Sequence, residues 1–92
     1  TAKAAIVGLT RSFARDLGPA GIRVNSVLPG AIMTQRQIDL WLTPQVEAQI
    51  LEGQCLKRKL LPADVAPIVL FLAADDARAC TNQSYVVDGG WS

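Results

Sequence analysis

A proline–glycine pair, Pro29-Gly30, ends a short run of strand-forming residues and is the first place where this sequence could bind a ligand. Proline cannot continue a strand ladder, and glycine leaves room for a flat group to lie against the backbone. Ligands of open parallel sheets bind beyond the carboxyl ends of the strands, where this pair falls. Thr34 adds a hydroxyl four residues later. These residues therefore offer backbone groups and one hydroxyl to a small, flat ligand.

Lys3 is the second candidate, because its charge is unfavourable where it stands. It falls in the first turn of a predicted helix, where the partial positive charge of the helix end favours anions. An exposed lysine near a fraying end is the ordinary interpretation, since most lysines are exposed. On a helical wheel, Lys3 lies with Val7, Thr10 and Ala14 at the edge of the apolar stripe. Whether this cation has a function depends on its surroundings.

The composition argues against other kinds of site. The formal net charge is +1, histidine is absent and the basic patch 57–59 is short, so we expect a solvated patch and no nucleic-acid partner. Cys55 and Cys80 lack the spacing of a zinc site, so we expect no metal and two reduced thiols, as in a cytoplasmic protein. The richest apolar run, 65–74, is far shorter than the ~20 residues that cross a bilayer, so no membrane segment is expected.

Three helices follow from spacing and capping. Residues 2–17 carry apolar side chains at three- and four-residue steps, which predicts an amphipathic helix that Gly18-Pro19 ends. Thr43 and Pro44 predict the start of a second helix, which runs to about Glu52. The apolar stripe predicted for the first helix consists of Ala2, Ile6, Leu9, Phe13 and Leu17.

A third helix begins at Pro62, and its apolar residues leave so little polar surface that we expect it to be nearly buried. Pro67 removes one backbone hydrogen bond inside it, which predicts a loose or 3₁₀-like first turn and a regular helix from near Ala66. No clean period is visible between residues 30 and 43, which predicts an irregular segment.

The strand-forming runs at 22–28 and 84–87 are separated by more than fifty mostly helical residues. Such strands can only be parallel neighbours joined by a right-handed crossover, as in a doubly wound α/β sheet. The order is helix, strand, helix, helix, strand. A parallel sheet buries both faces, so the first strand needs a further neighbour that this sequence does not contain.

The stretch TAKAAIVGLTRSFARDLGPAGIRVNSVLPGAIMT resembles the later part of short-chain dehydrogenases/reductases, beginning inside their Tyr-x-x-x-Lys active-site motif. LPADVAPIVLFLAADDA resembles the penultimate helix of that family, and YVVDGGW its last strand and turn. The resemblance implies that residues 1–92 are the C-terminal portion of a single Rossmann-like domain, without its nucleotide-binding half. The tail from Gln54 to Trp91 is similar to that of bacterial xylose and galactose 1-dehydrogenases, which oxidise an aldose at C1 to its lactone.

The resemblance gives Lys3 a role. In the family, the matching lysine binds the nicotinamide-ribose hydroxyls and lies beside the catalytic tyrosine, which the spacing places four residues upstream, before Thr1. A positive charge ~4 Å away, at an effective dielectric of ~20, favours the phenolate by about 4 kcal/mol, or roughly three pKa units. Positions i and i+4 share one helix face, so the spacing supplies the geometry. Lys3 is expected to be catalytic and cofactor-binding, and the isolated chain to be inactive.

The resemblance also assigns roles after the first strand. Pro29, Gly30, Ile32 and Thr34 match the segment that holds the nicotinamide of NAD or NADP. Residues 33 to about 54 match the variable substrate loop, which closes over the ligand. Three residues in that loop are expected to face a polyhydroxylated substrate: Gln35, Gln37 and Trp41.

The expected whole is a cytoplasmic, NAD(P)-dependent oxidoreductase acting on a sugar. The family commonly forms subunit contacts through its last helix and strand and through the small-residue line Ala4, Gly8, Ser12, so a homo-tetramer or dimer is expected. Asn82 stands where the family commonly has glycine, and Asn tolerates the left-handed conformation. The alternative from another class is a non-catalytic fragment or assembly module that keeps only the C-terminal half of the family domain.

Overall fold

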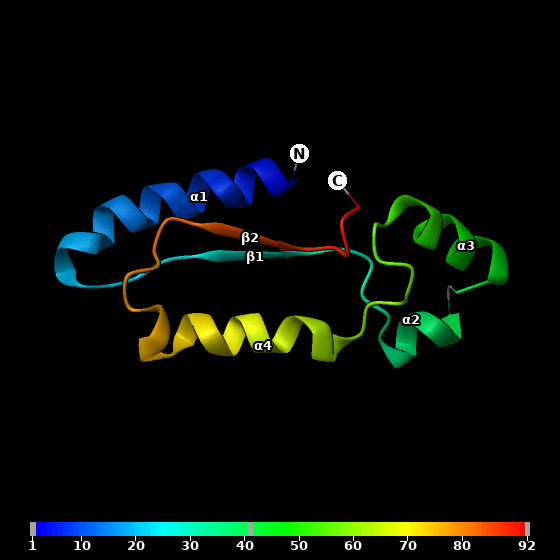
Figure 1. Ribbon diagram of the computed structural model, residues 1–92. Helices are drawn as coiled ribbons and strands as arrows, with labels where there is room; N and C mark the ends of the chain where they lie inside the picture. Colours follow the sequence, from blue (N-terminus) through cyan, green and yellow to red (C-terminus); the bar gives the residue numbers. More distant parts are fainter. Residues whose placement is uncertain (1, 41, 92) are drawn as a thin grey trace. The chain divides into compact units, whose positions relative to one another are not determined.

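A computed structural model of the chain describes residues 2–40 and 42–91 (Figure 1). It comprises two compact units, Thr1–Leu28 with Pro67–Val86 and Pro29–Ala66 with Val87–Ser92. The α-helices and strands are α1 (Ala2–Leu17), β1 (Ser26–Pro29), α2 (Gln35–Leu40), α3 (Pro44–Gly53), α4 (Pro62–Ala73) and β2 (Ser84–Val87), and the 3₁₀ turns are η1 (Gly18–Ala20) and η2 (Asp75–Ala77).

The two strands pair in parallel, as the sequence predicts. The N–H of Ser26 donates to the carbonyl of Gln83, and four residues further along both strands the N–H of Gly30 donates to Val87, each at 2.9 Å. In the first unit, α1 and the 67–73 part of α4 lie on opposite sides of the strand pair (Figure 1). This layering of helix, sheet and helix is that of an α/β fold, so the predicted fold class is confirmed.

Helix α1 begins and ends where predicted, and the face that it buries differs from the predicted apolar stripe. Thr10 and Ala14 are its buried residues, and the Thr10 hydroxyl donates to the Ile6 carbonyl at 2.8 Å. These two lie on the face that also carries Lys3, and small side chains let a helix approach its neighbour closely. The predicted apolar stripe is exposed at Ile6, Leu9, Phe13 and Leu17.

Two expectations for α4 are wrong. The helix is α-helical from Pro62 onward, with Pro67 inside it, because Ala63 and Pro67 are exposed and water can satisfy the carbonyl that proline leaves without its helical partner. It is not nearly buried either, since Leu70 is 71% exposed and Val69 and Phe71 are exposed as well. An all-round apolar helix needs covering on several sides, and the described residues do not supply it.

The segment after β1 contains a helix that the hydrophobic period missed. The Thr34 hydroxyl accepts a hydrogen bond from the N–H of Gln37 at 3.2 Å and so caps α2. Thr-x-x-Gln is the capping-box pattern, so the signal was present in residues 34–37. The cap predicted for α3 is confirmed, since the Thr43 hydroxyl accepts from the N–H of Val46 at 3.2 Å.

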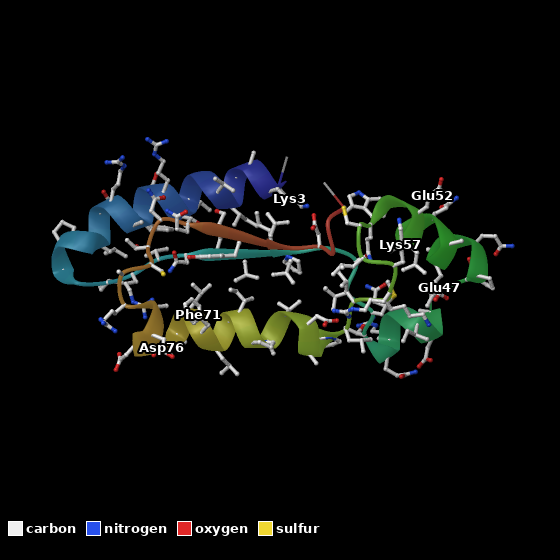
Figure 2. All side chains as sticks on the ribbon, viewed as in Figure 1. Lys3, Glu47, Glu52, Lys57, Phe71 and Asp76 are labelled. Atoms are coloured by element: carbon white, nitrogen blue, oxygen red, sulfur yellow. The ribbon has the colours of Figure 1, made fainter. Side chains whose placement is uncertain are left out.

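The basic patch 57–59 is exposed, and each of its residues has a partner. The Lys57 ammonium donates to three carbonyls at the C-terminal end of α3, of which Leu51 is 2.9 Å away (Figure 2). Lysine at this position offsets the negative end of the helix dipole. Arg58 and Lys59 form ion pairs with Asp64 and Glu47, at 2.9 and 3.4 Å.

Two smaller expectations are confirmed. Asn82 has the left-handed φ of 57°, and its N–H donates to the Val24 carbonyl at 2.8 Å. Cys55 and Cys80 are free thiols. Of the helices that the structure describes, none combines the length and the apolar character that a membrane span requires.

The Arg58–Asp64 pair predicts pH-dependent stability. The Arg58 guanidinium bonds both carboxylate oxygens, and the Leu61 N–H bonds one of them, so the pKa of Asp64 is lowered. A lowered pKa in the folded state stabilises the fold above the carboxyl's ordinary pKa of about 3.9, and that stabilisation is lost as the pH falls through the lower value. In the full-length protein, Asp64→Asn should therefore lower the Tm at neutral pH, and the difference should shrink in acid.

Thermal unfolding followed by circular dichroism across this pH range measures the difference. Asp76→Asn, at an exposed position in the other unit, is the matched control and should change the Tm less. A difference between Asp64→Asn and wild type that stays constant from neutral pH into acid contradicts the assignment.

Candidate functional site

A cavity of about 350 Å³ opens at the carboxyl end of β1, within the second unit. Such an edge is where open parallel sheets bind ligands. Its walls are mostly apolar, with one side-chain amide among them. The lining residues are Pro29, Gly30, Ala31, Ile32, Met33, Gln37, Leu42, Val46 and Ile50.

The backbone that forms one wall is held at two points. The N–H of Gly30 donates to the Val87 carbonyl at 2.9 Å, and the N–H of Met33 donates to the Leu60 carbonyl at 2.7 Å. Ile32 and Leu60 also form a parallel bridge. Hydrogen bonds at both ends restrict this wall, so the cavity has a preformed side against which a flat ligand can lie.

Gly30 is required by a close backbone approach. A Cβ added there would lie 2.7 Å from the Cβ of Asp88 and 2.8 Å from its Cα, closer than carbon atoms can pack. The space that glycine leaves open is therefore occupied by the turn after β2, and the other side of the Gly30 backbone lines the cavity. The sequence predicted glycine here for ligand access, and the structure adds this packing reason.

The structure brings four of the predicted site residues together around the cavity. Pro29, Gly30 and Ile32 come from the predicted cofactor segment. The fourth residue, Gln37, comes from α2. Thr34 lies next to them in sequence, but it is not part of the lining and its hydroxyl caps α2. Gln35 is exposed, and its side-chain amide donates to Asp39 at 2.9 Å. Trp41 lies outside the described residues.

Sequence reasoning missed the opposite wall. Leu42, Val46 and Ile50 recur at four-residue steps and present one apolar face from residue 42 through α3 to the cavity. The same spacing was used to find α1, so the signal was visible in the sequence. These residues fall inside the segment that the resemblance matches to the variable substrate loop.

Lys3 lies in the first turn of α1 (Figure 2). Its side chain is exposed, and it shares the helix face of the buried Thr10 and Ala14. Lys3 therefore stands at the end of the packed face of α1, in the first unit, whereas the cavity belongs to the second.

Comparison with known proteins identifies the family. The whole chain, residues 1–92, matches the family described as Enoyl-(Acyl carrier protein) reductase. D-xylose 1-dehydrogenase of Caulobacter vibrioides is 55% identical over 91 residues, which are 99% of this chain and 36% of that protein. A probable galactose dehydrogenase of Rhizobium meliloti is 53% identical over 90 residues, 98% of this chain and 35% of that protein. The chain belongs to the short-chain dehydrogenase/reductase family.

Solved structures agree with the family and the fold. A 4-hydroxyisoleucine dehydrogenase complexed with NADH matches with a TM-score of 0.90 and 36% identity, over 98% of this chain and 37% of that one. A 3-oxoacyl-[acyl-carrier protein] reductase from Brucella melitensis matches with a TM-score of 0.90 and 35% identity, over 98% of this chain and 33% of that one. The chain therefore spans about a third of the length of the proteins that it matches, and corresponds to part of a Rossmann-like fold.

The cavity's chemistry fits a nicotinamide ring. Such a ring is flat and needs apolar contact on its faces, with a few polar groups at its carboxamide. Ile32, Met33 and Val46 supply apolar surface, Gln37 supplies a side-chain amide, and residues 29–32 line the cavity beside them. The chain's own residues thus form a site of suitable character and size.

The close approach at Gly30 leads to a prediction. In the full-length protein, Gly30→Ala should lower the free energy of unfolding by about 1–3 kcal/mol, since the added methyl group overlaps Asp88 and forces the backbone apart. It should also weaken nicotinamide binding, because the displaced backbone lines the cavity. Denaturant unfolding and titration with the reduced cofactor measure the two effects.

Gly18→Ala is the matched control, because nothing lies within 4 Å of a Cβ added at that position. Equal stability and cofactor affinity of the two variants would show that Asp88 does not restrict position 30.

Proposed function

We propose that this chain is the C-terminal portion of an NAD(P)-dependent oxidoreductase that transfers a hydride between a nicotinamide and a carbinol or carbonyl carbon. The preferred substrate is an aldose, oxidised at C1 to its lactone. The observation that carries this proposal is the combination of about half-identical xylose and galactose dehydrogenase relatives with a cavity at the end of β1. The 92-residue chain alone is inactive in this account, because the tyrosine that its lysine serves lies outside it.

The cofactor is NAD or NADP, and the nicotinamide, when bound, accepts or donates the hydride. The backbone of Pro29–Ile32 holds its carboxamide, and the Thr34 hydroxyl, whose oxygen caps α2, donates its proton to a nearby phosphate. Gly30 and Met33 are tied to Val87 and Leu60 by hydrogen bonds, so this wall is ordered before a ligand arrives. An ordered wall fixes which face of the ring meets the substrate, and orientation of reacting groups lowers the barrier.

Lys3 supplies charge to the reaction. Its ammonium binds the ribose hydroxyls and lowers the pKa of the tyrosine four residues upstream, so that the phenolate accepts the substrate's hydroxyl proton near neutral pH. Two features of α1 support this role. Lys3 lies on the same face as the buried Thr10 and Ala14, and a tyrosine four residues upstream shares that face when the helix extends one turn further in the full-length protein.

Gln37 is the polar side chain of the cavity lining and the proposed contact to a sugar hydroxyl. Its amide both donates and accepts hydrogen bonds, as a hydroxyl requires. Val46 and Ile50 offer apolar surface to the C–H face of the sugar ring. The segment that contains α2 and α3 closes over the ring. Gln35 is bonded to Asp39 and contributes less in this account. Contact from Trp41 remains a prediction.

The proposed enzyme is cytoplasmic and works as a homo-tetramer or dimer. The exposed apolar side chains of α1 and α4, among them Phe13 and Leu70, support contact with further protein surface. A non-catalytic assembly module is not favoured, because the relatives named above are dehydrogenases over the same residues.

A panel of aldoses tests the proposed reaction. The full-length protein should reduce NAD or NADP with at least one aldose and release the lactone, measured by absorbance of the reduced nicotinamide. Gln37→Leu should raise the KM for the aldose about five- to tenfold through loss of a hydrogen bond, with a smaller effect on the cofactor KM. Gln35→Leu, two residues away, is the matched control. Absence of turnover with every aldose and both cofactors removes the sugar proposal.

Lys3→Met tests the proton transfer. Loss of the charge should lower kcat/KM at neutral pH by roughly a thousandfold, matching about three units in the pKa of the tyrosine. The activity should recover in part as the pH rises toward about 10, where an unassisted tyrosine ionises, whereas the loss from the missing ribose contact should persist at every pH. Lys59→Met is the control for removal of a surface lysine. A pH profile of Lys3→Met parallel to that of wild type would refute the role.

A further inference from the structure

Gln54 is almost completely buried, although glutamine is a polar residue that is usually exposed. It is 1% exposed and stands at the C-terminal cap of α3, outside the lining of the cavity. Its Nε2 donates to the carbonyls of Leu56 and Arg58, each at 3.0 Å, whereas its Oε1 is buried without a hydrogen-bond partner. If the amide were flipped, Oε1 would face two carbonyl oxygens, and neither could donate a hydrogen bond to it. The amide orientation with Nε2 toward the carbonyls is therefore the correct one. An apolar side chain would avoid the unpartnered acceptor, but it could not hold the two carbonyls.

The carbonyls that Gln54 holds belong to the loop that supports the cavity wall. This loop runs from Leu56 to the buried Leu60, whose carbonyl accepts from the N–H of Met33 at 2.7 Å and which pairs with Ile32. The Gln54 amide is therefore linked to the wall at Ile32–Met33 by its hydrogen bonds to Leu56 and Arg58, by the covalent backbone from there to Leu60, and by the hydrogen bond between Leu60 and Met33.

The turn after β2 contacts both ends of segment 30–54, which runs from the end of β1 to the loop that Gln54 holds. At one end Asp88 packs on Gly30. At the other end the N–H groups of Cys55 and Leu56 donate to the carbonyls of Gly90 and Gly89, at 3.3 and 2.9 Å. The Gln54 amide lies against Gly89, where an added Cβ would be 3.1 Å from Nε2. Residues 30 and 54–56 are thus fastened to the same four-residue turn, 88–91.

We propose that Gln54 is a positioning residue for hydride transfer, although it touches neither cofactor nor substrate. Together with the turn 88–91, its amide forms a clamp that holds both ends of segment 30–54 and fixes the backbone wall at Ile32–Met33. α2 and α3 can then move over the substrate while the wall behind the nicotinamide stays in place. This inference rests on the proposed function for its catalytic consequence, but the clamp itself can be observed in the protein without cofactor.

Gln54→Leu in the full-length protein tests the clamp, with Gln49→Leu, an exposed position of α3, as the matched control. Hydrogen exchange of the cofactor-free protein should show the Met33 amide exchanging about tenfold faster in Gln54→Leu, with no change in Gln49→Leu. The Kd for NADH or NADPH should rise, and kcat should fall by about ten- to a hundredfold through misplacement of the ring. The KM for the aldose should change less.

Gln54→Glu provides a second variant, also suited to the case in which Gln54→Leu does not fold. A protonated carboxyl can donate to one of the two carbonyls, whereas the carboxylate can donate to neither. Protection of the Met33 amide in Gln54→Glu should therefore increase as the pH falls, relative to wild type. The clamp is overturned if the Met33 amide exchanges as slowly in both variants as in wild type. It is also overturned if the Met33 amide of Gln54→Glu exchanges at the wild-type rate at every pH. Failure of wild type to bind NADH or NADPH overturns the proposed function instead, and leaves the exchange result to decide the clamp.

Discussion

The second unit depends on a backbone contact that no side chain could occupy. Gly30 and Asp88 approach so closely that a methyl group at position 30 would overlap the Asp88 backbone. This contact brings the end of β1 against the turn after β2, and the Gly30 to Val87 hydrogen bond continues the strand pairing up to that point. The cavity opens where the pairing ends, because the chain leaves the sheet after the Gly30 to Val87 hydrogen bond. The pairing of the strand ends and the position of the cavity therefore both depend on the close contact between Gly30 and Asp88.

A second constraint acts on α1. The face that carries Lys3 packs through Ala14, which is small, and Thr10, whose hydroxyl donates a hydrogen bond to a carbonyl of its own helix. Such a face lets the helix lie close to the sheet without burying an unsatisfied polar group. The larger apolar residues Ile6, Leu9 and Phe13 lie on a neighbouring face and are exposed in this chain. Hydrophobic period alone therefore predicted the helix, but it did not indicate which face is buried in this chain.

Local signals predicted most of the fold. Thr43-Pro44 predicted the start of α3, and the strand-forming run at 84–87 predicted β2, because caps and short strands depend on nearby residues. The short α2 was missed because six residues give no period, although Thr34 and Gln37 carried a capping signal. The expected burial of α4 was wrong, since burial depends on surfaces beyond those that the described residues supply.

The candidate site was predictable in part. Pro29, Gly30 and Ile32 were identified by the resemblance and do line the cavity. The close approach at Gly30 and the buried amide of Gln54 were not predictable, because both depend on tertiary contacts with the turn 88–91, distant in sequence.

We propose that residues 29–32 hold a nicotinamide while Lys3 binds its ribose. A crystal structure of the full-length protein with NADH or NADPH tests it most directly. The account predicts the carboxamide against the backbone of Pro29–Ile32 and the Lys3 ammonium within hydrogen-bond distance of the ribose hydroxyls. A nicotinamide bound away from this cavity, or a Lys3 side chain out of reach of the ribose, would contradict it.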